Sequence, residues 1–197
     1  MSDIHVLRNR LKSIVLTRSF RYSPDPPFLL TSGKTSPYYF DCKKTTLEPE
    51  GAFLIGEILW DMVRDMPPVG VGGLTLGADP MASALMHSAW RRGRRIPQFI
   101  VRKEPKKHGT AQWIEGNVQP GDRVLIVDDV VTTGGSVIKS IERAKEAGLI
   151  VQEVILLVDR EEFNAMEHVR IAADSAPVRA ILTKTELMEL YNSKESA

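Results

Sequence analysis

Residues 124–136 read VLIVDDVVTTGGS, and this stretch decides the fold. Its first four residues, 124–127, are apolar and have the length of a buried strand. Asp128 and Asp129 follow, and then comes a turn rich in threonine and glycine. A helix that begins after such a turn presents its first backbone amides, which lack partners within the helix, to an anion. The stretch therefore predicts a strand, a phosphate-binding loop and a helix in that order.

The residue types in this loop suit a phosphorylated sugar. Gly134 and Gly135 let the main chain approach an anion closely. Two adjacent carboxylates would repel a bare polyphosphate, so Asp128 and Asp129 need hydroxyl donors or a cation as partners. A ribose 5-phosphate supplies both the phosphate and the hydroxyls. Further hydroxyl donors come from Thr132, Thr133 and Ser136.

Two other interpretations of the stretch are weaker. A nucleotide-triphosphatase loop ends in Gly-Lys-Ser or Gly-Lys-Thr, whereas residues 134–136 are Gly-Gly-Ser, without the lysine. Alternatively, the two acids only begin a loop and the glycines only turn the chain. An isolated Asp-Asp pair would favour that interpretation, but the complete run from the strand to Ser136 favours phosphate binding.

Short apolar strands alternate with helical segments on both sides of this stretch. The expected strands are 69–73, 98–101, 123–127 and 150–158, and the expected helices are 79–90 and 136–147. Thr183 and Glu186 have the spacing of a capping box that opens a C-terminal helix. This alternation predicts an α/β fold, a parallel sheet with helices on both faces, whose ligand-binding loops follow the carboxyl ends of the strands.

Two helices are expected before the alternation begins. Apolar residues at helical spacing predict the first over residues 4–15, and the proline-rich segment 23–27 follows it. The second begins at Pro49 and stops before the next pair of prolines. The expected single domain, residues 1–197, is divided into an N-terminal flap, 1–66, and a core, 67–197.

The composition excludes several classes of protein. The 26 basic and 25 acidic residues leave a formal charge of +1, which gives no overall field for nucleic acid or a membrane surface. Cys42 is the only cysteine, which excludes an intramolecular disulfide and a multi-cysteine metal site and favours a reducing compartment. Charged residues are scattered along the N-terminal segment, so it lacks the continuous apolar stretch of a signal peptide. We therefore expect a cytoplasmic protein.

At residues 124–136 the chain resembles the type I phosphoribosyltransferases. The resemblance implies their α/β fold with a small N-terminal hood. It also implies phosphoribosyl pyrophosphate as the donor substrate, with magnesium as a cofactor held mainly through that substrate and by no direct protein ligands. The residues that it assigns to donor binding here are Asp128, Asp129, Val130, Val131, Thr132, Thr133, Gly134, Gly135 and Ser136.

Residues 28–41, FLLTSGKTSPYYFD, resemble the N-terminal signature of the orotate phosphoribosyltransferases. The resemblance implies that an aromatic pair, Tyr39 and Phe40, lies against the flat pyrimidine ring. These aromatics could instead be core residues of a strand, but the polar run immediately before them favours a turn that faces a ligand. Two positions depart from the family pattern, because Thr31 and Leu76 stand where many members carry lysine.

Residues 102–110, RKEPKKHGT, follow an expected strand and have no apolar face. Such a run is usually a solvated charged segment. Its spacing resembles the mobile catalytic loop of the orotate phosphoribosyltransferases, which closes over the pyrophosphate. Cations that arrive on closure would stabilise the negative charge that gathers on the leaving group. The resemblance assigns this role, and contacts with the donor, to Arg102, Lys103, Lys106 and His108.

Arg160 follows the strand that ends at Val158. Its position matches the family residue that pairs with the orotate carboxylate, for which a guanidinium offers two parallel hydrogen bonds. A surface arginine in a helix cap is the alternative. The resemblance also brings Thr132 to the orotate site.

Together these motifs imply an orotate phosphoribosyltransferase activity in pyrimidine (UMP) biosynthesis, with the ring nitrogen of orotate attacking the anomeric carbon. Asp129, Lys106, Arg102 and His108 are the expected catalytic residues. Family resemblance also implies a homodimer whose loops cover the partner's sites.

Three alternative functions fit the sequence less well. A purine phosphoribosyltransferase should lack the 102–110 run, and a regulator with this fold would need a DNA-binding helix pair. A fused decarboxylase would need a longer chain.

Overall fold

The computed structural model describes residues 4–29, 33, 35–105 and 112–195. Its centre is a six-stranded sheet with the order β10-β9-β8-β5-β6-β7. All neighbouring strands are parallel except β7, which is antiparallel to β6 at one edge. The strands are β5 (Gly70–Leu74), β6 (Gln98–Val101), β7 (Ile114–Gly116), β8 (Arg123–Val131), β9 (Ile150–Asp159) and β10 (Val178–Thr183).

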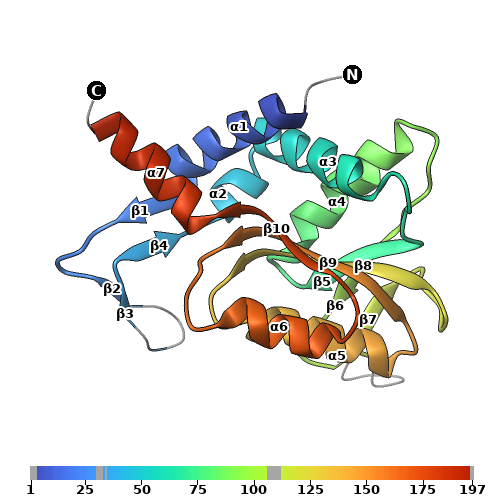
Figure 1. Cartoon of the computed structure of the whole chain (residues 1–197). Coiled ribbons are helices and arrows are strands. Elements are labelled where there is room, and N and C mark those ends of the chain that lie inside the picture. The colour runs from blue at the N-terminus through green and yellow to red at the C-terminus, as the bar shows by residue number, and fades with distance from the viewer. Residues whose placement is uncertain (1–3, 30–32, 34, 106–111, 196–197) are drawn as a thin grey trace.

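Helices cover both faces of this sheet, which confirms the expected α/β architecture (Figure 1). One face carries α1 (Ile4–Ile14), α3 (Pro49–Val63), α4 (Ala78–Trp90) and α7 (Lys184–Glu195). The other carries α5 (Gly135–Glu146) and α6 (Ala165–Ala173). Helix α3 begins at Pro49, as expected, and the side chain of Glu48 accepts a 2.9 Å hydrogen bond from the amide of Gly51.

The central strands are buried on both faces, because alternate residues of each apolar run pack into the hydrophobic cores on the two sides of the sheet. Leu125 and Val127 point into the core beneath α3 and α4, whereas Ile126 points into the core above α5. This division follows from the two-residue period of a strand. Continuous apolar strands of this kind are typical of parallel sheets with helices on both sides.

Strand β8 extends beyond its expected end at Val127 and includes both acids. The expectation that Asp128 and Asp129 follow the strand is therefore wrong. The strand continues because β9 continues beside it, pairing Asp128 with Leu156 and Val131 with Asp159. A pairing with a strand so far along the chain is not visible in the local pattern of residues.

Short strands near the N-terminus form a separate region at one end of the central sheet (Figure 1). Strand β1 (Phe20–Tyr22) is antiparallel to β4 (Tyr38–Phe40). Strand β2 (Phe28–Leu29) is antiparallel to β3 (Thr35–Ser36). A π-helical turn, η1 (Val15–Ser19), leads into β1, and a short helix, α2 (Lys43–Thr46), follows β4.

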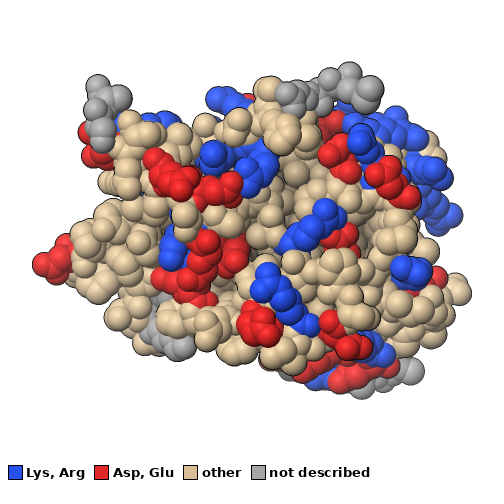
Figure 2. All heavy atoms as spheres, viewed as in Figure 1, with Lys and Arg blue, Asp and Glu red and all other residues tan. Residues whose placement is uncertain are grey.

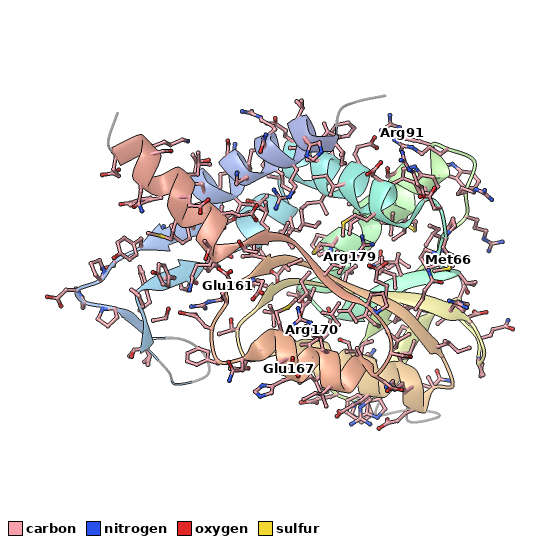
Figure 3. All side chains as sticks on the ribbon, in the orientation of Figure 1. Met66, Arg91, Glu161, Glu167, Arg170 and Arg179 are labelled. Carbon is pink, nitrogen blue, oxygen red and sulfur yellow. The ribbon has the colours of Figure 1, made fainter. Side chains whose placement is uncertain are left out.

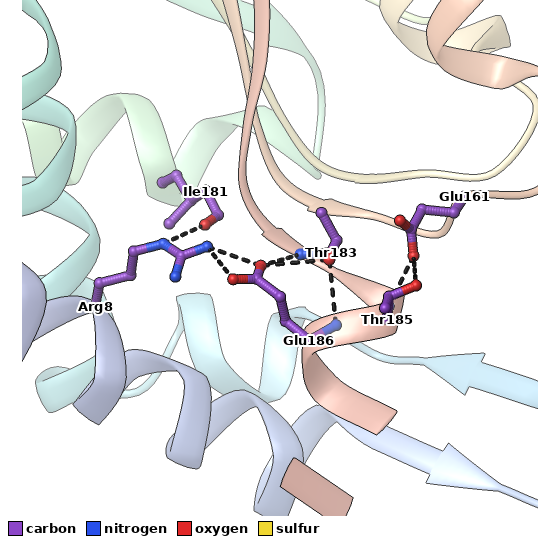
Figure 4. Close-up of polar contacts among 6 residues, drawn as sticks. All are labelled: Arg8, Glu161, Ile181, Thr183, Thr185 and Glu186. Carbon is purple, nitrogen blue, oxygen red and sulfur yellow. Dashed lines mark hydrogen bonds and ion pairs between the residues drawn. The ribbon is translucent and has the colours of Figure 1, made fainter. Parts of the chain in front are cut away.

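The expected capping box is present at the start of α7 (Figure 4). The amide of Thr183 donates to the Glu186 carboxylate at 3.0 Å, and the amide of Glu186 donates to the Thr183 hydroxyl at 3.2 Å. Arg8 of α1 donates to both oxygens of the same carboxylate, at 2.6 and 2.7 Å, and to the carbonyl of Ile181 at 2.9 Å. Glu186 thus joins the first and last helices.

Positive and negative side chains are mixed over the face shown in Figure 2, in keeping with the formal charge of +1. Among the described helices, none combines the length and the apolar character needed to cross a membrane.

Candidate active site

The loops that follow β5, β8, β9 and β6 lie together, because these neighbouring parallel strands end at the same edge of the sheet. Ligands of such sheets bind at this edge, between strands whose connections leave toward opposite faces. Strand β5 leads to α4 on one face, and β8 leads to α5 on the other. The expected site therefore sits where this fold can open a crevice.

The loop after β8 can bind an anion with its backbone. Gly134 has a φ of +87° and directly precedes α5. This left-handed conformation favours glycine, and it turns the chain so that the helix starts toward the site. No side chain in the described part of the chain caps the first amides of α5. Those amides can donate to a phosphate.

Two buried carboxylates lie beside this helix start. Asp128 is 4% exposed and Asp129 is 6% exposed. The hydroxyl of Ser136 donates a 2.6 Å hydrogen bond to Asp128 Oδ2, and the amide of Asp129 donates to Asp128 Oδ1 at 3.1 Å. Burial, helped by the charge of Asp129, raises the pKa of Asp128 to about 7.

Asp129 is the acid with an unused acceptor. Its Oδ2 is buried and accepts no hydrogen bond from any described residue. Burial raises the pKa of Asp129, and the ammonium of Lys43, whose Nζ lies 4.0 Å from Oδ2, opposes the rise. A hydroxyl group or a cation placed there would satisfy the oxygen. The sequence patterns did not point to Lys43, because it lies far from the acids along the chain.

Gly77 lies directly against both acids. A Cβ atom at this position would be 2.4 Å from Asp128 Oδ1 and 2.8 Å from Asp129 Oδ1. Thr75, in the same turn, donates a 2.6 Å hydrogen bond to Asp79 Oδ2. The other oxygen of Asp79 is buried without a partner among the described residues. The turn after β5 therefore lies against the two carboxylates, and only glycine at position 77 leaves room for them.

Arg160 reaches the site from the end of β9 and is 4% exposed. Its NH1 donates weakly to the Thr132 hydroxyl at 3.4 Å, so Arg160 and Thr132 lie together as expected. Its NH2 donates to the carbonyl of Tyr38 at 2.9 Å. The expected alternative, a surface arginine, does not agree with this burial. Desolvation lowers the pKa of Arg160, and the Glu162 carboxylate opposes that change.

Comparisons with known proteins identify the family. A family model described as a phosphoribosyl transferase domain matches residues 46–167. The orotate phosphoribosyltransferase of Aquifex aeolicus is 41% identical over 181 residues, which cover 92% of this chain and 97% of that protein. The chain belongs to the orotate phosphoribosyltransferase family. The resemblance drawn from the sequence motifs is thereby confirmed.

Solved structures from the orotate phosphoribosyltransferase family share the fold. A crystal structure of the Mycobacterium tuberculosis orotate phosphoribosyltransferase has a TM-score of 0.78 and 36% identity, covering 92% of this chain and 98% of that one. A second structure of that enzyme, in complex with phosphoribosyl pyrophosphate, has a TM-score of 0.74 and 35% identity over the same shares.

The aromatic pair expected from the family signature is divided between two faces of β4. Phe40 is buried, and the guanidinium carbon of Arg160 lies 5.5 Å from its ring centre. Tyr39 is 38% exposed, and its ring centre lies 5.5 Å from that of Phe28. Successive strand residues point to opposite sides, so Phe40 lies with Arg160 and Tyr39 with Phe28.

The cationic loop of the family is only partly within the described residues. Lys106 and His108 lie outside them. Arg102 NH1 lies 3.2 Å from a carboxylate oxygen of Glu115, and the carbonyl of Lys103 accepts a 2.6 Å hydrogen bond from Lys139. Thr133 is half-buried in the phosphate loop, whereas Val130 and Val131 are the last residues of β8.

Proposed function

We propose that this protein transfers the phosphoribosyl group of phosphoribosyl pyrophosphate to orotate, giving orotidine 5'-monophosphate and pyrophosphate. The observation that carries the proposal is the meeting of three features at one sheet edge: the uncapped start of α5, the buried acids and the buried guanidinium of Arg160. A phosphate, a ribose and a carboxylate need these three kinds of partner. The names of the relatives agree with this reaction.

The donor would bind over the loop at residues 132–136. Its 5-phosphate would accept hydrogen bonds from the first amides of α5, and its ribose hydroxyls would donate to Asp128 and Asp129. As pyrophosphate leaves, the anomeric carbon becomes cationic, and the negative charge of Asp129 stabilises it. Positioning and electrostatics account for this chemistry, and no covalent intermediate with the protein is required.

Orotate would bind with its carboxylate on Arg160 and its ring on the aromatic side of the pocket. Arg160 Nε is buried and has no hydrogen-bond partner among the described residues, so it has a donor available for a carboxylate. A guanidinium with that donor free binds a carboxylate strongly. Phe40 and Thr132, which lie beside Arg160, are the other residues that we assign to this subsite. Tyr39 lies on the opposite side of β4 and cannot share the ring contact with Phe40.

Magnesium fits the site as a cofactor carried by the donor. Asp129 Oδ2 is the buried acceptor that a magnesium-bound water or a ribose hydroxyl would satisfy. Among the described residues, no three His, Cys, Asp or Glu side chains are grouped to hold a metal ion, so most ligands would come from the donor. Bound magnesium would offset the negative charge of the leaving pyrophosphate.

Arg102, Lys103, Lys106 and His108 would interact with the pyrophosphate from the loop after β6. Cations that contact the leaving group in the transition state raise turnover more than they raise donor affinity. His108 would donate a hydrogen bond or a proton to the pyrophosphate.

A homodimer would complete the site. A groove of about 440 Å³ between α3 and α4 is lined by Leu47, Phe53 and Pro80. Leu47 is 69% exposed and Phe53 is 49% exposed. Exposed apolar side chains gathered around a groove mark an interaction surface. A second copy of the chain would bury this surface and could bring its own cationic loop to the neighbouring site.

The test is an assay of pyrophosphate release with purified protein, phosphoribosyl pyrophosphate and magnesium. We expect turnover with orotate and none with uracil, adenine, hypoxanthine or guanine, and loss of turnover when magnesium is chelated. Turnover with a purine base and none with orotate would overturn the proposal. Fractionation of the source cells should find the activity in the cytoplasm.

A further inference from the structure

The Arg160 guanidinium contacts a carboxylate of the protein. Its NH2 lies 2.7 Å from Oε2 of Glu162, whose side chain is only 14% exposed. This contact is an ion pair and not an aligned hydrogen bond, because Oε2 has no hydrogen-bond partner among the described residues. One edge of the guanidinium therefore faces a carboxylate of the protein, and the Nε donor stays available.

The Glu162 carboxylate is in turn hydrogen-bonded by a residue of the N-terminal region. The hydroxyl of Ser36 donates a 2.6 Å hydrogen bond to Glu162 Oε1, across 126 positions of the sequence. The amide of Tyr38 donates to the same Ser36 hydroxyl at 3.1 Å, and the carbonyl of Tyr38 accepts from Arg160. These contacts form a closed ring that runs from Arg160 through Glu162, Ser36 and Tyr38 back to Arg160.

The backbone around Glu162 is held in an unfavourable conformation. Glu161, Phe163 and Asn164 have φ values of 53°, 58° and 53°. Entering this left-handed region costs residues such as Glu161 and Phe163 about 1 kcal/mol each, and asparagine less. Strain of this kind persists where the surroundings fix the chain, and it is concentrated at functional sites. Here it surrounds the residue whose carboxylate faces Arg160.

We infer that Glu162 is a positioning residue that orients the Arg160 guanidinium for the orotate carboxylate, with Ser36 holding Glu162 in place. The inference rests on the proposed role of Arg160. A long arginine side chain can adopt many rotamers, and a buried cation without a carboxylate partner is costly. Glu162 supplies that partner before orotate arrives. The pocket is then preorganised, and orotate has only to satisfy the remaining donors.

The test compares two neighbouring glutamates. Glu162→Ala should raise the KM for orotate about tenfold, because the Arg160 guanidinium would no longer be oriented for its charged hydrogen bond with the orotate carboxylate. The same substitution should change kcat and the KM for the donor little. Glu162→Gln keeps the acceptor for the Ser36 hydroxyl but loses the charge that faces Arg160, so it should recover only part of the loss. Glu161→Gln is the matched control. Glu161, labelled in Figure 3, accepts hydrogen bonds from the amide and the hydroxyl of Thr185 at the start of α7, at 2.7 and 2.6 Å (Figure 4).

A second variant separates this inference from the proposed function. If Glu162 acts through Arg160, adding Glu162→Ala to Arg160→Ala should not raise the orotate KM further. An orotate KM that rises in Arg160→Ala but not in Glu162→Ala would overturn the positioning role. An unchanged orotate KM in Arg160→Ala would instead overturn the assignment of Arg160. Binding of orotidine 5'-monophosphate, followed by calorimetry, should show the same ranking without turnover.

Discussion

The hydroxyl of Ser136 donates a 2.6 Å hydrogen bond to Oδ2 of Asp128, across the turn that joins β8 to α5. The bond favours the charged form of an acid that burial makes costly to ionise. Burial is the larger effect, because the pKa of Asp128 lies near 7, well above its usual 3.8. This acid therefore titrates within the range where many enzymes work.

The first prediction is that Asp128→Asn stabilises the fold at high pH. Between pH 3.8 and about 7, the folded protein holds a proton on Asp128 that the unfolded chain releases. Stability from this group is thus fully present at low pH and is lost as the pH rises. From pH 4 to pH 8 the variant should gain about 3–4 kcal/mol of unfolding free energy over the wild type. Urea denaturation at several pH values measures this, and a pH-independent difference would contradict it.

Asp129→Asn should separate turnover from donor binding. The substitution keeps the shape of the side chain and removes the negative charge that would face the cationic sugar. We expect kcat to fall about 10–100-fold while the dissociation constant of the donor changes about threefold or less. Asp122→Asn, at the opposite end of β8, is the control and should leave both constants unchanged. Normal turnover with weakened donor binding would mean that Asp129 only positions the ribose.

Gly77→Ala should damage the donor site. The added methyl group would lie 2.4 Å from Asp128 Oδ1, and Ser136 holds that carboxylate from its other side. The acids would have to leave the positions that suit the ribose, so the donor KM should rise about tenfold or more. Steady-state kinetics with both substrates provide the measurement. Wild-type kinetics in this variant would show that the carboxylates can move without cost.

The proposed dimer can be tested by mixing two variants of low activity, Lys106→Ala and Asp129→Asn. If the loop serves the partner's site, half of the sites in each mixed dimer combine an intact loop with intact acids, and activity returns after subunit exchange. If the loop serves its own subunit, every site keeps one defect and mixing restores nothing.

A charge placed in the proposed dimer surface should dissociate the dimer into monomers. Phe53→Glu places a charge in the groove between α3 and α4 and should shift the protein to monomers in sedimentation experiments. Ile171→Glu is the matched control, because Ile171 is 69% exposed on α6, over the other face of the sheet. If Ile171→Glu dissociated the dimer and Phe53→Glu did not, the interface would not lie at the groove between α3 and α4.

Glu186→Ala should weaken the attachment of α7. Partial burial raises the pKa of Glu186, but the hydrogen bonds from Arg8 and from the Thr183 amide together outweigh it, so the pKa of this carboxylate is lowered. Its contribution is therefore present above the usual pKa of a glutamate and is lost as the pH falls. Unfolding free energy at pH 7 should drop about 1–2 kcal/mol, since the ion pair is partly exposed. Glu189→Ala, on the exposed side of α7, should lower the unfolding free energy by less. An equal loss in the two variants would contradict the proposed role of Glu186 in attaching α7.

Elements that depend on neighbouring residues were predicted correctly from the sequence. Helix α3 begins at its proline, β6 spans Gln98–Val101, and the capping box forms at Thr183. Elements that depend on distant partners were not. Strands β1–β4 have two or three residues each, and β8 runs on through both acids only because β9 lies beside it.

By itself the sequence determined the chemistry available at the site, because residue types and their spacing define a phosphate loop, two adjacent acids and an arginine after a strand. Only the tertiary structure decided how these groups are partnered. It brings Lys43 to Asp129, Gly77 against both acids, and Glu162 to Arg160. The reason is physical: burial and close charges set the pKa and orientation of a group, and both arise from residues that meet only when the chain folds.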